Sequence, residues 1–194
     1  MRFSEKERLI NEIFDANNPV RQRKAAYRMR YIKNDPEIIR ILFGACYEAS
    51  DVKLQQEAVK SLKILKPEKA IKAFKQSTFN SDAEKRKRAY YHLRTLGIPI
   101  PLEILKNGLE DENVAVRRAA VVASGKLGNN YSIIKILKQL LNPYEPLSLQ
   151  KEIRKAIDNI EKNFFQTKSL NKYHFKEEKP FYRGNTDKYY PKAF

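Results

Sequence analysis

The chain has 194 residues, of which 42% are hydrophobic, and its 39 basic and 23 acidic side chains give a formal net charge of +16. This is enough apolar sequence for one folded domain, and no run of 18 apolar residues could form a membrane span. The N-terminal residues lack the apolar stretch of a secretory signal, and Cys46 is the single cysteine, so we expect a cytoplasmic protein. The positive charge favours anionic partners.

The first predicted helix, 5–15, opens with a capping box formed by Ser4 and Glu7. Four longer helical segments follow, and each begins with residues that favour a helix start. These segments are 17–35, 50–68, 81–99 and 111–130. Their expected N-caps are Asn18, Asp51, Ser81 (in a second capping box) and Asp111. Shorter apolar helices are expected after each segment, at 36–48, 67–78, 100–109 and 131–141, and a last helix at 146–164.

The four longer segments are repeats of one pattern. Ala25, Ala58, Ala89 and Ala120 are spaced 33, 31 and 31 residues apart, and Ile32, Leu65, Leu96 and Leu127 keep the same spacings. A fixed period of this length is typical of stacked helical hairpins. The sequence therefore predicts an all-α solenoid of about five antiparallel helix pairs over residues 1–164.

The aligned segments resemble HEAT-like repeats, in the short form named after phycobilisome lyases. The closest match is DENVAVRRAA at 111–120, which closes on GKLG at 125–128, and the resemblance covers about residues 4–164. It implies a right-handed superhelix whose second helices line the concave side. Phycobilin lyases use related repeats, and so does a family of alkylpurine DNA glycosylases that relies on Trp and a catalytic Asp, whereas this chain has no Trp.

One face of each repeated segment is apolar. At 100° per residue, the positions equivalent to Ala25, Ala26, Met29 and Ile32 form a continuous stripe. Fifteen of its sixteen members are apolar or Tyr and none is charged, so we expect this stripe to form the core. The other members are Ala58, Val59, Leu62, Leu65, Ala89, Tyr90, Leu93, Leu96, Ala120, Val121, Ser124 and Leu127.

The opposite face, which we call the cationic ladder, is predicted to be the partner-binding surface. Seven of its twelve positions are basic, two are Tyr and none is acidic. Its candidate binding residues are Arg23, Tyr27, Arg30, Lys60, Lys63, Lys87, Tyr91, Arg94 and Arg118. Stacked repeats would align these solvent-facing side chains, which could contact phosphates and bases or hold acidic side chains. A solvated face with no specific partner is the alternative.

Residues 165–194 are predicted to form an irregular, extended tail that is basic and aromatic. They carry eight Phe or Tyr and seven Lys or Arg against three acids, a composition unlike that of a solvated linker. In one interpretation Tyr173, Phe175, Phe181 and Tyr182 cap the last repeat. In the other, the tail docks on a partner, with Tyr189, Tyr190 and Phe194 as anchors.

No reaction centre is recognisable in the sequence. His92 and His174 lack a nearby His or Cys at metal-ligand spacing, and we expect Cys46 to be a buried structural thiol. We therefore expect no catalytic residue, cofactor or metal. The predicted function is a non-enzymatic binding or scaffold protein for an acidic protein surface or a multi-subunit complex. The alternatives are a module that binds RNA or DNA through the phosphate backbone and a phycobilin-lyase-like chromophore chaperone.

Overall fold

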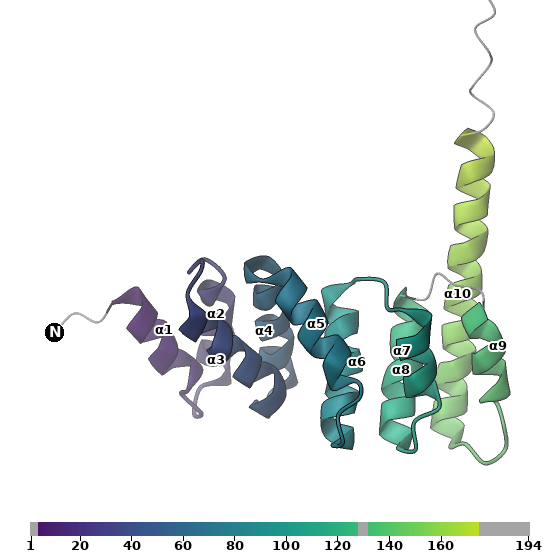
Figure 1. Ribbon diagram of the computed structural model, residues 1–194, viewed down its shortest axis with the longest axis horizontal. Coiled ribbons are helices and arrows are strands. Elements are labelled where there is room, and N and C mark those ends of the chain that lie inside the picture. The colour runs from purple at the N-terminus through teal and green to yellow at the C-terminus, as the bar shows by residue number, and fades with distance from the viewer. Residues whose placement is uncertain (1–3, 128–131, 175–194) are drawn as a thin grey trace, which may run out of the picture.

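The computed structural model describes residues 4–127 and 132–174, which contain ten α-helices in chain order (Figure 1). Their bounds agree with the predicted helices as far as residue 164, except that α2 ends at Met29, well before the predicted end at residue 35. The helices are α1 (Glu5–Ile13), α2 (Pro19–Met29), α3 (Pro36–Glu48), α4 (Val52–Leu65), α5 (Pro67–Ser77), α6 (Ala83–Leu96), α7 (Leu102–Leu109), α8 (Val114–Leu127), α9 (Ser132–Gln139) and α10 (Leu147–His174).

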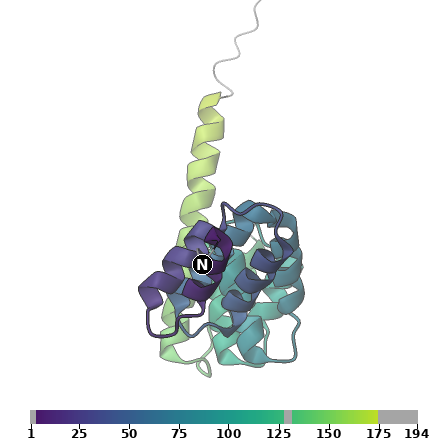
Figure 2. The same cartoon turned by 90° about the vertical axis from the view of Figure 1, so that its left-hand side faces the viewer.

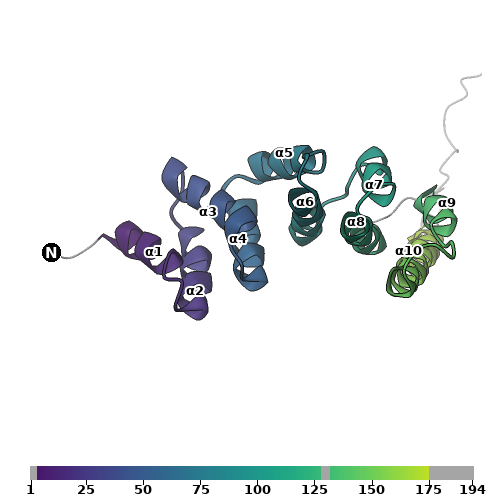
Figure 3. The same cartoon turned by 90° about the horizontal axis from the view of Figure 1, so that it is seen from below.

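The helices form five sequential pairs stacked into an elongated row, which confirms the predicted all-α solenoid. The second helices of the pairs, α2, α4, α6, α8 and α10, lie side by side and pack on one another in order. Figure 3 shows α3, α5, α7 and α9 along one side of this row. Each repeat therefore contacts mainly its sequence neighbours, as expected for a solenoid.

The predicted apolar stripe is the core between the helices. Ala25, Ala58, Ala89 and Ala120 have no accessible surface, because neighbouring helices approach closely over them. The other stripe residues whose side chains are described are also buried, except Ile32 and Leu65, which are half-buried. The second helix of each pair is thus held on one face by apolar contacts, which leaves the opposite face for the ladder.

Most of the expected helix starts are confirmed, and two are shifted. Ser4 forms the predicted capping box with Glu7. At α6 the predicted box at Ser81 is wrong, because Asp82 is the N-cap and accepts from the amide of Glu84 at 2.8 Å. At α8 the cap is Asn113 and not Asp111, whose carboxylate instead accepts from the amide of Asn113 in the preceding turn. The remaining caps are Asn18, Asp35 and Asp51.

A polar side chain on the first turn of each second helix bonds to the turn just before that helix. We call these five residues the loop-pin column: Gln22, Gln55, Arg86, Arg117 and Gln150. Each donates to one or two backbone carbonyls at 2.7 to 3.2 Å. Their spacings are 33, 31, 31 and 33 residues, so the column follows the repeat and extends it to α10. The column fixes each turn to the helix that follows.

Arg86 also joins two repeats. Its Nη1 donates to the carbonyls of Asn80 and Ser81, both at 2.9 Å, while Nε and Nη2 donate to both carboxylate oxygens of Asp111 at 2.8 and 2.9 Å. Its side chain is 10% exposed and that of Asp111 is 6% exposed. Arg117 repeats the arrangement with Glu145 at 2.8 Å. A buried bidentate pair of this kind is directional and fixes the register between repeats.

Helix α10 continues for ten residues past the predicted start of the extended tail and ends at His174. The boundary predicted at residue 165 is therefore wrong for the backbone, because residues 165–174 contain neither Pro nor Gly to stop the helix. The end of α10 rises clear of the packed repeats (Figures 1 and 2). Tyr173 lies in this part of the helix. The other proposed anchors lie outside the described residues: Phe175, Phe181, Tyr182, Tyr189, Tyr190 and Phe194.

The loop-pin column predicts a graded loss of stability on substitution at Arg86. Arg86→Ala should lower the free energy of unfolding by about 2–3 kcal/mol, because it leaves the buried Asp111 carboxylate and two carbonyls without their donor. Arg86→Gln, the residue found in repeats one, two and five, should recover part of the loss by restoring the loop bond. Urea denaturation followed by circular dichroism measures both. Equal losses in the two variants would contradict a role in holding the loop.

Candidate functional site

The N-terminal part of the ladder is occupied by contacts to the next repeat. Arg23 Nε lies 2.6 Å from a carboxylate oxygen of Asp51, the N-cap of α4. Arg30 pairs with Glu57 and also reaches Ser61 at 3.3 Å. With its side chain only 13% exposed, Arg30 is enclosed between α2 and α4.

The middle of the ladder has acceptors as well. Lys60 lies 3.3 Å from Glu57, and Lys87 lies 2.6 Å from Glu84, one turn away on its own helix. Lys63 donates to the carbonyl of Leu96 at 2.6 Å, where α6 ends in the next repeat. Most of the ladder cations therefore already have acceptors within the chain. The acceptors lie outside the twelve aligned positions, so counting charges on that face could not find them.

Both ladder tyrosines lie against arginines. The guanidinium carbon of Arg30 is 4.1 Å from the centroid of the Tyr27 ring, and that of Arg94 is 5.3 Å from the centroid of Tyr91. The Tyr27 and Tyr31 hydroxyls are 3.1 Å apart. The first and third repeats thus carry the same stacked pair, but only in the third does the arginine have no carboxylate partner among the described residues.

Four cations without carboxylate partners among the described residues line a cleft of about 600 Å³ between α8 and α10, which we call the α8–α10 cleft. Its lining includes four basic residues: Arg94, Lys126, Lys155 and Lys162. Its other lining residues are Val122, Gly125, Glu152, Ala156, Asn159 and Asn163. No carboxylate among the described residues lies within ion-pair distance of the four cations. The one lining acid, Glu152, lies 3.3 Å from Arg118, the last ladder residue.

The floor of this cleft is a close approach of two helices. A Cβ atom at Gly125 would lie 2.8 Å from the Cα of Ala156, so only glycine permits α8 and α10 to meet there. The cations stand around this point of contact. Arg94 is half-buried, whereas Lys126, Lys155 and Lys162 are exposed. Such a cleft can hold a compact group with several negative charges.

Three of these four cations were not predicted from the sequence. Lys155 and Lys162 lie on α10, which was not aligned with the other second helices, and Lys126 lies on α8 just outside the ladder positions. The loop-pin column supplies the missing alignment, since Gln150 follows Arg117 by 33 residues. The same spacing of 33 residues aligns Lys155 on α10 with Val122, a ladder position on α8. The loop-pin column, and not the Ala and Leu columns, therefore contains the information that aligns α10 with the other second helices.

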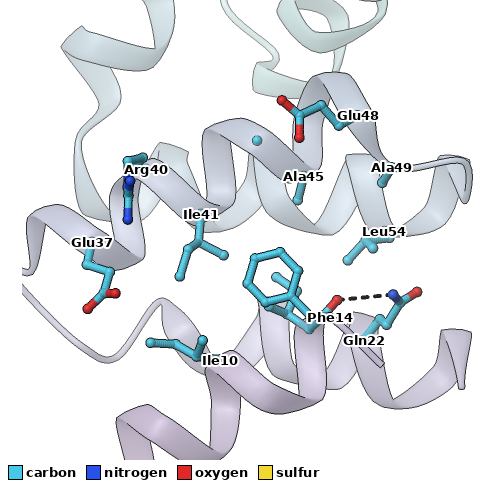
Figure 4. Close-up of a pocket in the computed structure, with 12 residues that line it drawn as sticks. Ile10, Phe14, Gln22, Glu37, Arg40, Ile41, Ala45, Glu48, Ala49 and Leu54 are labelled. Carbon is cyan, nitrogen blue, oxygen red and sulfur yellow. Dashed lines mark hydrogen bonds between the residues drawn. The ribbon is translucent and has the colours of Figure 1, made fainter. Parts of the chain in front are cut away.

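A second hollow, of about 550 Å³, lies between α1 and α3, and we call it the α1–α3 groove (Figure 4). Its apolar lining is Ile10, Ile13, Phe14, Ile41, Gly44, Ala45, Ala49 and Leu54. The phenyl ring of Phe14 is seen over the groove, and the residue is 68% exposed. Behind it, Gln22 donates to the carbonyl of Ile13 at 3.0 Å and so fixes the end of α1. Glu37, Arg40 and Glu48 supply the polar lining.

Gly44 in this groove differs from the other helical glycines. A Cβ at Gly108 would lie 2.3 Å from the Tyr90 ring, and one at Gly125 would clash with Ala156, so packing requires both glycines. At Gly44 a Cβ would meet only the Glu48 carboxylate, at 3.8 Å. Glycine inside a helix costs about 1 kcal/mol relative to alanine. The contacts among the described residues give no reason for that cost at Gly44.

The two residues considered for reactive chemistry are buried together. Cys46 and His92 are 0% and 2% exposed, and His92 Nε2 lies 2.9 Å from the carbonyl of Cys46. Burial raises the pKa of the Cys46 thiol above its usual range and lowers the pKa of His92 to about 4. The His92 ring packs on Phe74 and Tyr47, with centroids 4.9 and 5.5 Å apart. The buried structural thiol is confirmed, and His92 is a core residue.

Within residues 4–127 and 132–174, no group of three or more His, Cys, Asp or Glu side chains is placed to hold a metal ion. None of the helices there is both long and apolar enough to span a bilayer.

No protein-family model matches the chain, and no curated protein matches it. Among solved structures, it is similar to an engineered protein determined as target OR329 of the Northeast Structural Genomics Consortium. The two are 18% identical, the match covers 79% of this chain and 78% of the other, and the TM-score is 0.46. This is a likeness of fold alone.

The environment of Gly44 predicts that alanine stabilises the chain. Gly44→Ala should raise the free energy of unfolding by about 0.5–1 kcal/mol, because a Cβ fits and the helix propensity improves. Gly108→Ala is the matched control and should be destabilising, since its Cβ would overlap the Tyr90 ring. Thermal or urea denaturation compares the two. A destabilising Gly44→Ala would mean that the groove is closed to a methyl group.

The buried His92 predicts an acid-sensitive fold. Its folded pKa of about 4 lies below the ordinary value of 6.5, so the unfolded chain binds more protons between these two pH values. Stability is therefore fully present above pH 6.5 and falls as pH decreases toward 4, by up to about 3 kcal/mol. Urea denaturation of the wild type and His92→Gln at several pH values isolates the effect. A glutamine variant with the same slope across this window would refute it.

Proposed function

We propose that this chain is a HEAT-like, non-enzymatic docking protein that binds an acidic protein surface, alone or as part of a larger assembly. The observation that carries the proposal is the clustering of Arg94, Lys126, Lys155 and Lys162 around the α8–α10 cleft without carboxylate partners. Unpaired positive side chains around a shallow cleft are suited to steering and holding a patch of Asp and Glu.

The distribution of paired and unpaired cations favours a protein partner over a nucleic acid. A nucleic-acid backbone requires cations along a continuous track, so that many phosphates are neutralised at once. Along the row of second helices, Arg23, Arg30 and Lys87 already pair with carboxylates. The unpaired cluster is local, and an acidic loop or helix end needs only such a local site.

Arg94 has a particular role in this proposal. Its guanidinium lies over the Tyr91 ring, and no described carboxylate pairs with it. Arginine can donate to both oxygens of a carboxylate at once, which lysine cannot. We expect Arg94 to define the position of one partner carboxylate and the three lysines to add attraction over a wider area.

Charge reversal in the cleft tests the proposal. Arg94→Glu combined with Lys155→Glu should weaken binding of a labelled ten-residue polyglutamate peptide by at least about tenfold, because the cleft then repels it. Lys24→Glu with Lys53→Glu is the matched control: both residues are exposed, and the net charge changes equally. Fluorescence anisotropy at moderate salt measures the affinities. Equal losses in the two double variants would show that only net charge matters and would overturn the cleft as the site.

A parallel titration with single-stranded RNA and duplex DNA separates the partner classes. Acidic-protein docking predicts weak nucleic-acid binding that salt abolishes and that the two double variants reduce to the same extent. Tight binding of either nucleic acid that is lost selectively in the cleft variant would replace the proposed function by the nucleic-acid alternative. A bilin that co-purifies with the protein would instead favour the chromophore chaperone.

A further inference from the structure

The α1–α3 groove is a second binding surface, independent of the cationic cleft. We propose that it receives the aromatic C-terminal segment, residues 175–194, of a second copy of this chain. The contact joins the first repeat of one molecule to the end of the next, so that copies associate head to tail.

Two observations indicate that the groove is built for an occupant. Phe14 is 68% exposed beside the half-buried aliphatic side chains of Ile10 and Ile41. Gly44 lacks a side chain where one would fit without a clash, unlike Gly108 and Gly125. The absent side chain leaves the backbone of α3 open at the groove, so that a ring or chain from outside can approach it closely.

The chemistry of the segment complements the groove. Residues 175–194 contain six Phe or Tyr and five Lys or Arg against three acids. The groove itself is lined by two acids, Glu37 and Glu48, and one cation, Arg40. Glu48 lines the groove, and none of the described cations pairs with it. Aromatic side chains would enter the apolar groove while lysines meet its acidic edge.

The position of α10 favours a second copy over the same molecule. The segment begins after His174, at the opposite end of the row from α1, where α10 has risen clear of the repeats (Figure 1). Its twenty residues reach at most about 66 Å when fully extended. Four repeat steps of about 10 Å and the projection of α10 would consume most of that length within one molecule. A neighbour placed end to end brings the segment to the groove without this constraint.

Sedimentation velocity of the full chain tests the contact. The wild type should form larger species as its concentration rises from about 1 to about 200 µM, the range expected for a small interface. Gly44→Leu should weaken this association at least about tenfold by filling the groove. Ala115→Leu is the matched control, since it adds the same side chain at an exposed position of α8 and should associate like the wild type. Circular dichroism checks that both variants keep their helices.

Changes in the segment itself test the same contact without touching the folded repeats. Tyr189→Ser, Tyr190→Ser and Phe194→Ser together should abolish association, and an excess of a synthetic peptide of residues 175–194 should dissociate wild-type assemblies. A wild type that stays monomeric throughout, or association that survives either Gly44→Leu or the triple variant, would overturn the proposal. The cleft variant Arg94→Glu with Lys155→Glu should still self-associate, so this proposal and the proposed function can fail separately.

Discussion

The fold depends on the bond between each second helix and the turn that precedes it. Apolar stacking alone leaves the turns between helices without partners for their carbonyls, and buried carbonyls without donors are costly. The loop-pin column supplies one donor per repeat, from Gln22 to Gln150, always on the first turn of the second helix. Where the residue is arginine, the same side chain extends to an acid of the next repeat. The loop-pin position therefore fixes the turn of its own repeat. In the third and fourth repeats it also sets the register of the next repeat.

Contacts between repeats also explain why most of the positive face is not available for partners. A solenoid with short repeats has little apolar area between neighbouring units, and charged pairs across the unit boundary add specificity of register. Arg23 and Arg30 serve this purpose between the first two repeats. Near α10, Arg117 and Arg118 pair in the same way with Glu145 and Glu152. The cations of the α8–α10 cleft lie outside these pairs.

The fold was predictable because it depends on local and repeated signals. The Ala and Leu columns give the period of four repeats, and the helices predicted before and after them complete the five pairs. The candidate site was predictable only in part. Arg94 was identified by its place in the ladder, but the partners of Arg30 and Lys87 lie one turn or one repeat away, at positions that a single-face projection leaves out. The α1–α3 groove could not be predicted, because it results from how far two helices diverge and not from any residue type.

The close approach at Gly125 has a consequence for how the cleft meets a ligand. Because α8 and α10 touch through their main chains, the separation of the cleft's two walls is set by backbone contact and not by adaptable side chains. The charges on the two walls repel each other, yet they cannot relax by moving the helices apart without breaking the packed core around Ala156. In the function proposed above, the backbones of the two walls are already in place, and only the exposed lysine side chains would have to become ordered on binding.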